Sequence, residues 1–159
     1  MSEKVVNSLV WLKRILEEHE VPFQIVGGLA AKIHGGSRPV ADIDLYIPKE
    51  LAENILPSVS NYISKPLTHY VEYGWDLEYC QLIYQGQKIE IGLSPGTKIF
   101  NAITSEWIEL VTDYSRSVVT SYEGVEVPVI PVSELIAYKS LLNREVDLID
   151  ISELTHSRR

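Results

Sequence analysis

The sequence predicts a single α/β (α+β) domain in which a mixed β-sheet is flanked by helices. Residues 5–19 carry an apolar stripe at helical spacing with charged residues opposite it. Strand-like and helix-like patterns then alternate through residues 23–47, as in α/β folds. With 159 residues and 45% hydrophobic composition, the chain suits one domain with its own core. We expect that domain to cover residues 1–159, with residues 131–159 as a C-terminal helical part.

A glycine pair follows the first predicted strand. The apolar run over residues 23–26 ends abruptly at Gly27 and Gly28, as a buried strand does at a tight turn. A short amphipathic segment comes next and closes on a second glycine pair, which favours a helix C-terminus there. Backbone N–H groups at a glycine turn that opens a helix form an anion site, so this corner is a candidate phosphate cradle.

The next strand, over residues 42–47, places two carboxylates on one face. Side chains alternate along a strand, so Asp42 and Asp44 lie together while Ile43 and Leu45 face the core. Two neighbouring carboxylates repel each other unless a cation compensates them. Oxygen-only ligands favour Mg²⁺ or Mn²⁺ as that cation. An Asp-x-Asp pair at a solvated strand end is the common alternative.

These residues resemble a known signature. Gly27 and Gly28, thirteen residues and then Asp42-Ile43-Asp44 look like the motif of the nucleotidyltransferase superfamily with the DNA polymerase β-like fold. With Arg38 shortly before the aspartates, the stretch is similar to the small bacterial members. These members include minimal nucleotidyltransferases, antibiotic-modifying enzymes and toxins related to abortive-infection proteins.

The resemblance implies roles for these residues. Asp42 and Asp44 would hold two Mg²⁺ (or Mn²⁺) ions that bridge a nucleoside triphosphate. The glycine pair, with Ser37 or Arg38, would anchor its β- and γ-phosphates. A two-metal site of this kind stabilises both the entering and the leaving oxygen of an in-line displacement.

A predicted hairpin supplies the third carboxylate. Strand-like runs over residues 77–84 and 87–93 flank Gln85-Gly86, a pair that suits a tight turn. Glu90 lies between Ile89 and Ile91, as the family's third acid lies between apolar neighbours, and it would ligate metal and help to deprotonate the acceptor. The family usually has Asp at this place. Glu90 as an ordinary exposed strand residue is the alternative, and Asp76 is the second choice for the third ligand.

The remaining elements are predicted from local patterns. Pro48 favours a helix start, with a helix that reaches towards Ile63 and is interrupted at Pro57. Apolar residues at helical spacing suggest a weak helix within residues 97–110. Strands are expected at residues 118–119 and 125–130. A helix then begins after Pro131, with Ser133 as its N-cap.

Charged residues near the C-terminus have two readings. Lys139 lies on the last predicted helix, and Arg144, Asp147 and Asp150 follow it. Several small nucleotidyltransferases show a similar order. This resemblance implies that Lys139 reaches the nucleotide phosphates while an aspartate orients it. Local salt bridges on a helix surface would explain the same spacing.

Composition limits the partners. The net charge of −8 and a pI near 5.0 argue against a broad nucleic-acid footprint and therefore weigh against tRNA as a substrate. No run approaches the ~20 apolar residues of a membrane helix. One cysteine, Cys80, excludes an internal disulfide and fits a reducing compartment, so we expect a cytoplasmic protein.

The predicted function is transfer of a nucleoside monophosphate to an acceptor hydroxyl. A protein, a small molecule such as an antibiotic or, less favourably, a tRNA would carry that hydroxyl. A protein partner within a toxin–antitoxin type system is one setting for such an enzyme. The competing hypothesis is a degenerate member that binds nucleotide or a partner without catalysis. Glu90 in place of Asp, and the lack of a serine after Gly27, allow that hypothesis.

Overall fold

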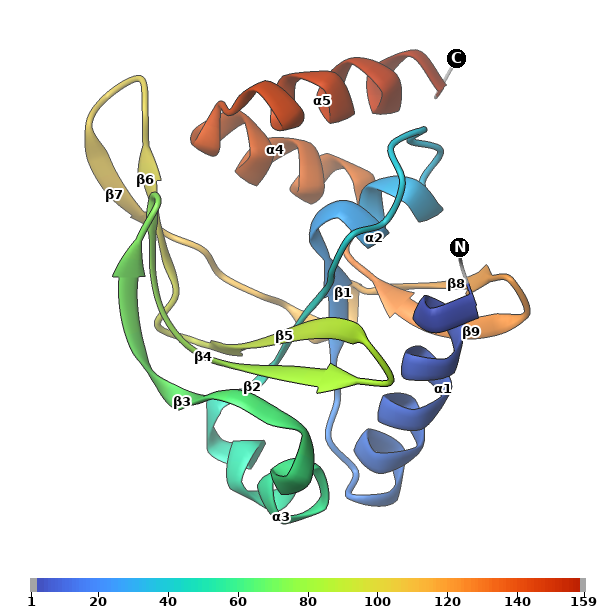
Figure 1. Ribbon diagram of the computed structural model, residues 1–159. Coiled ribbons are helices and arrows are strands. Elements are labelled where there is room, and N and C mark those ends of the chain that lie inside the picture. Colours follow the sequence, from blue (N-terminus) through green and yellow to red (C-terminus); the bar gives the residue numbers. More distant parts are fainter. Residues whose placement is uncertain (1–2, 158–159) are drawn as a thin grey trace.

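A computed structural model describes residues 3–157 of the chain (Figure 1). Within them, one mixed sheet contains nine strands: β1 Gln24–Val26, β2 Ile43–Pro48, β3 Ile63–Glu72, β4 Trp75–Tyr84, β5 Gln87–Ser94, β6 Lys98–Asn101, β7 Glu106–Glu109, β8 Val118–Tyr122 and β9 Val125–Val129. The strands lie in the order β7-β6-β4-β5-β2-β1-β9-β8, and β3 pairs with β4. The predicted α/β class with a mixed sheet is confirmed.

Helices flank this sheet. The α-helices are α1 Glu3–Glu18, α2 Gly27–Ile33, α3 Leu56–Val59, α4 Val132–Leu142 and α5 Glu145–Ser157, and short 3₁₀ turns cover Lys49–Asn54, Ser60–Tyr62 and Tyr114–Arg116. Helix α1 packs against β5 and β9, whereas α2 lies against β1, β2 and α4. Figure 1 shows α4 and α5 side by side above α2, and the β3–β4 and β6–β7 hairpins curving up towards them. No helix within residues 3–157 has both the length and the apolarity to cross a membrane.

Two parallel strands at the centre of the sheet position the site residues. Strand β2 pairs in parallel with β5, and Asp44 lies directly opposite Glu90. The alternate residues Ile43, Leu45 and Ile89 are fully buried in the core on the other face. Removal of such side chains from water is the main favourable contribution to folding. The same period-two pattern that builds the core therefore delivers two carboxylates to one point on the opposite face.

Three tight hairpins carry the outer strands. The two-residue turns Tyr73-Gly74, Gln85-Gly86 and Glu123-Gly124 all have positive φ at both positions, as type I′ turns require. The turn at Gln85 agrees with the sequence prediction, and the turn at Glu123 joins the strands expected on either side of it. Strand β3, which precedes Tyr73, was not predicted. Most of its residues are exposed, and only Ile63, Leu67 and Tyr70 are half-buried, so β3 lacks the period-two apolar pattern that marks a strand.

Several local predictions are wrong. Ile63 begins β3 and does not extend a helix, because the chain after Pro48 forms a 3₁₀ turn and then a four-residue helix that ends at Val59. Residues 97–110 form β6 and β7, so the apolar residues there pack across a hairpin. Helix α4 starts without a side-chain cap, so Ser133 does not cap it. The predicted C-terminal helical part consists of two helices because Asn143 adopts a left-handed conformation between them.

Candidate functional site

A cleft of about 510 Å³ contains the three predicted carboxylates. Asp42 precedes β2, Asp44 lies on it, and Glu90 faces Asp44 from β5. All three side chains line this cleft. The structure therefore brings together acids that lie up to 48 residues apart in the sequence.

A lysine lies between two of these acids. The Nζ atom of Lys88 is 3.5 Å from Oδ2 of Asp42 and 3.3 Å from Oε1 of Glu90. Burial acts to lower the pKa of Lys88, but the charges of Asp42 and Glu90 raise it above its ordinary value. Lys88 therefore stays charged and compensates these two carboxylates, which are the outer members of the group.

The central acid has an unusual protonation equilibrium. Burial, followed by the negative charges of Glu90 and Asp42, raises the pKa of Asp44 from 3.8 to about 7. Lys88 and the more distant Lys139 oppose this shift without cancelling it. Near neutral pH, the cations around Asp44 therefore do not fully compensate the negative charge that its ionised carboxylate carries.

The donor chemistry at this point fits a divalent cation. Three carboxylates supply only oxygen atoms, which suits Mg²⁺ or Mn²⁺. Burial is the main cause of the raised pKa of Asp44, and the neighbouring charges of Glu90 and Asp42, which a cation would compensate, raise it further. Among residues 3–157, no group of three or more His, Cys, Asp or Glu side chains is arranged to hold a metal ion as it stands. Lys88 gives a physical reason, because its ammonium holds Asp42 and Glu90 around itself. The carboxylates would have to close around a metal ion in its place.

The glycine corner lies against the central acid. Gly27 has a φ of +66°, and a Cβ atom there would lie 2.5 Å from Oδ2 of Asp44. The N–H of Gly27 donates a hydrogen bond of 2.7 Å to the hydroxyl of Tyr138. A side chain at Gly28 would meet nothing within 4 Å, and no side chain caps the start of α2. The open side of the corner is therefore at Gly28, which lines the cleft.

Three cations form the opposite wall of the cleft. Arg38, Lys139 and Arg144 all line it and are held by two aspartates of α5, Asp147 and Asp150. Asp150 accepts two hydrogen bonds from Arg38 at 2.7 and 2.8 Å and lies 3.0 Å from Lys139. Asp147 binds Arg144 in the same two-pronged manner, at 2.7 and 3.0 Å, and lies 3.4 Å from Lys139. We name these three cations, together with Asp147 and Asp150, the basic cluster.

The two aspartates of the basic cluster are buried. Asp147 and Asp150 are at most 1% exposed, so they are not the surface salt bridges that formed the alternative reading of the sequence. Burial acts to raise the pKa of Asp150, but hydrogen bonds from Arg38 and Lys139 hold this pKa below its ordinary value. Three cations against two carboxylates leave one excess positive charge, and the exposed cations of the group are Arg38 (33%) and Arg144 (48%), whereas Lys139 is buried between the aspartates. Such an excess suits a phosphate ligand.

Two predicted candidates lie elsewhere. Ser37 bonds Glu153 of α5 through its amide and its hydroxyl, and it is not among the residues that line the cleft. With the Arg38–Asp150 pair, this contact fastens the α2–β2 connection to α5. Asp76 pairs with His69 at 2.5 Å on the β3–β4 hairpin and does not line the cleft either.

Aromatic residues of the β3–β4 hairpin line the cleft beyond Glu90. Trp75 and Tyr79 lie there with Tyr73, which is 89% exposed and has a φ of +50°. The hydroxyl of Tyr79 bonds both Lys65, at 3.3 Å, and Glu72, at 3.4 Å. Tyr79 of β4 is paired with Gly92 of β5, two positions after Glu90, so Tyr79 and Glu90 share one face of the sheet. The aromatic wall therefore continues the sheet face that carries Glu90.

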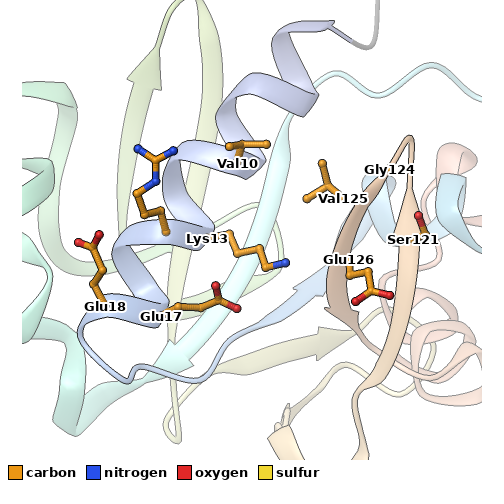
Figure 2. A pocket seen from close by; sticks show the side chains of 9 residues that line it. Val10, Lys13, Glu17, Glu18, Ser121, Gly124, Val125 and Glu126 are labelled. Carbon is orange, nitrogen blue, oxygen red and sulfur yellow. The ribbon is translucent and has the colours of Figure 1, made fainter.

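A second hollow, of about 720 Å³, lies between α1 and the β8–β9 hairpin (Figure 2). Lys13 and Glu17 of α1 face Glu126 across it in Figure 2. None of the predicted site residues line this hollow, and cations and acids alternate around it. It offers no constellation for chemistry.

Sequence reasoning missed the aromatic wall of the cleft and also two residues beside the acids and the glycine corner, Lys88 and Tyr138. Lys88 was available from the pattern, because it is two residues before Glu90 and must share its strand face. Tyr138 gives no comparable signal. A tyrosine next to Lys139 on an apolar helix indicates packing, and only the contact between α4 and α2 brings its hydroxyl to Gly27.

Comparisons with known proteins identify the architecture. No family model and no curated protein sequence matches the chain. Among solved structures, a candidate nucleotidyltransferase from Thermotoga maritima, TM1012, superposes with a TM-score of 0.67 and 22% identity, covering 96% of this chain and 94% of its own. The lincosamide antibiotic adenylyltransferase LnuA, bound to lincomycin, gives a TM-score of 0.62 and 14% identity over 94% and 95% of the two chains. The antibiotic-resistance factor ANT(2'')-Ia gives 0.63 and 14%, over 100% of this chain and 86% of its own.

These matches extend over nearly the whole chain, and at these identities they concern the fold. They agree with the motif resemblance of Gly27-Gly28 and Asp42-Ile43-Asp44, which was drawn from the sequence independently. The chain therefore has the nucleotidyltransferase fold that the resemblance predicted.

Proposed function

We propose that this protein transfers a nucleoside monophosphate from a nucleoside triphosphate to an acceptor hydroxyl. The observation that carries the proposal is the arrangement of the cleft. Asp42, Asp44 and Glu90 lie on one side, and the basic cluster with its excess positive charge lies on the other. A Mg²⁺–triphosphate has matching chemistry, with a cation for the acids and phosphate oxygens for the arginines and lysine.

Each residue has a role in this proposal. Asp42, Asp44 and Glu90 would hold Mg²⁺ or Mn²⁺, which supplies charge stabilisation at the phosphate oxygens. Gly28 and the basic cluster would bind the β- and γ-phosphates, which leave as pyrophosphate when the bond to the α-phosphorus breaks. Glu90 would accept the proton of the acceptor hydroxyl as its oxygen forms the new bond to that phosphorus.

The acceptor enters over the aromatic wall in this proposal. Of the three proposed metal ligands, Glu90 is the one on β5, the strand that pairs with β4, and it lies on the same sheet face as Tyr79, so a hydroxyl presented from this wall reaches the acid that would deprotonate it. LnuA is a lincosamide antibiotic adenylyltransferase with lincomycin bound, and ANT(2'')-Ia has been solved in complex with adenylyl-2''-tobramycin. A small molecule is therefore the first acceptor class to test, before a protein or a tRNA.

The decisive experiment is transfer of radiolabel from α-labelled triphosphates. Purified protein is incubated with Mg²⁺ and each nucleotide, together with a cell lysate separated into small-molecule, protein and RNA fractions. Labelled product should appear in one fraction with wild type and disappear with Asp42→Asn. Asp76→Asn is the matched control, because this aspartate lies outside the cleft, and it should retain transfer.

A binding protein without catalysis is the second candidate. The observation that favours it is the Lys88 ammonium, which already compensates two of the three carboxylates. Calorimetry with each triphosphate, with and without Mg²⁺, separates the two functions. Binding of nucleotide without transfer in any lysate fraction would reject the enzyme and support the binding protein.

A further inference from the structure

We propose that Lys88 is an internal competitor for the divalent cation and sets the metal concentration at which the site fills. Its ammonium occupies the space between Asp42 and Glu90, so a metal ion that binds both carboxylates must displace it. This inference rests on the metal site of the proposed function. It adds a regulatory contact that the motif of the fold does not contain.

The geometry distinguishes Lys88 from an ordinary surface ion pair. Its Nζ lies at similar distances, 3.5 and 3.3 Å, from carboxylates supplied by two different segments of the chain. Strand alternation places the Lys88 side chain on the same face as Glu90, so it is directed there by the backbone. By contrast, Lys49 pairs at 2.5 Å with Glu78 alone and lies outside the cleft.

The contact of Lys88 with Asp42 and Glu90 has opposite effects with and without metal. Without metal, the ammonium compensates acids that would otherwise repel each other, so the site is assembled before any cation arrives. With metal, the same ammonium is a positive charge that must leave. All three side chains are between 33% and 41% exposed, so solvent weakens these ion pairs and the competition is modest.

The test measures metal binding without nucleotide and without turnover. Mn²⁺ is titrated into the protein, and free Mn²⁺ is followed by electron paramagnetic resonance. Lys88→Met removes the competing charge at similar length, and we expect it to bind Mn²⁺ about tenfold more tightly, or about 1.4 kcal/mol. Lys88→Arg keeps the charge and should stay near the wild-type affinity. Lys49→Met makes the same chemical change outside the cleft and should leave the affinity unchanged.

The outcomes separate this inference from the proposed function. Thermal unfolding in EDTA first confirms that each variant is folded. If Mn²⁺ binds wild type and Asp44→Asn abolishes that binding, the metal site is established. An unchanged or weaker affinity of Lys88→Met then overturns the role of Lys88 alone. If neither wild type nor Lys88→Met binds Mn²⁺, the proposed metal site fails and the competitor role fails with it.

Discussion

Replacement of Asp44 by Asn should stabilise the metal-free protein at alkaline pH. Burial and the charges of Glu90 and Asp42 raise the pKa of Asp44 to about 7, so the folded state resists ionisation of this carboxyl. Between about pH 4 and pH 7 the folded chain holds a proton that the unfolded chain has lost. The free energy of unfolding therefore falls as the pH rises from about 4 to about 7. Above pH 7 the folded protein bears the full cost of ionising this carboxyl.

The pKa values bound the size of this effect. The interval from 3.8 to about 7 corresponds to at most about 4 kcal/mol, at 1.36 kcal/mol for each pH unit. The Asp44 side chain is half-buried and the cleft is open to solvent, which reduces that limit. We therefore expect Asp44→Asn to gain about 1–3 kcal/mol at pH 8.5, about a quarter of that at pH 4.5 and almost nothing at about pH 3.

Urea denaturation in EDTA at a series of pH values measures this difference. Asp150→Asn is the contrasting variant, because Arg38 and Lys139 hold the pKa of Asp150 below its ordinary value against the effect of burial. It should lose about 2–4 kcal/mol at pH 7, because Arg38 loses its partner and the buried Lys139 keeps only Asp147. Equal stability of Asp44→Asn and wild type at pH 8.5 would refute the account of charge accumulation in the cleft.

Four further substitutions test other parts of the site. Gly27→Ala should lose about 1–3 kcal/mol in urea denaturation and lose Mn²⁺ binding, because its methyl group would meet Asp44, whereas Gly28→Ala should be neutral in stability. Tyr138→Phe leaves the Gly27 amide without its partner and should cost about 1–2 kcal/mol by the same assay; a neutral result would contradict the role of the hydroxyl. Tyr73→Asn relieves a left-handed tyrosine and should gain about 0.5–1 kcal/mol, while the KM for the acceptor rises if Tyr73 contacts it.

The central part of the site could be predicted because it depends on short-range rules. Alternation along residues 42–47 and 87–93 fixes which side chains leave the core, and the pairing of β2 with β5 then places Asp44 opposite Glu90. The turn at Gln85-Gly86 follows from its residue types. Alternation and turn chemistry need no knowledge of how distant segments meet, whereas the meeting of Asp44 with Glu90, 46 positions later, was expected from the family resemblance.

The rest of the site depends on packing between elements that are far apart in sequence. Arg38 reaches Asp150 across 112 positions, and Tyr138 reaches Gly27 across 111. A local pattern does not encode such meetings, so the aspartates of α5 resembled a solvent-exposed face in sequence and are buried in the structure. Strand β3 was missed for a related reason: its residues are mostly exposed and gain their order from pairing with β4.

The acidic composition and the cationic wall are compatible because they act at different ranges. A net charge of −8 is spread over the surface, where salt screens it within about 10 Å. The excess charge of the basic cluster is fixed inside a cleft by Asp147 and Asp150, which are shielded from solvent. A long polyanion meets the whole surface and is repelled, whereas a single triphosphate meets only the cleft. In the proposed function, the same chain therefore disfavours extended nucleic acids and still presents the excess positive charge of the basic cluster to one nucleotide.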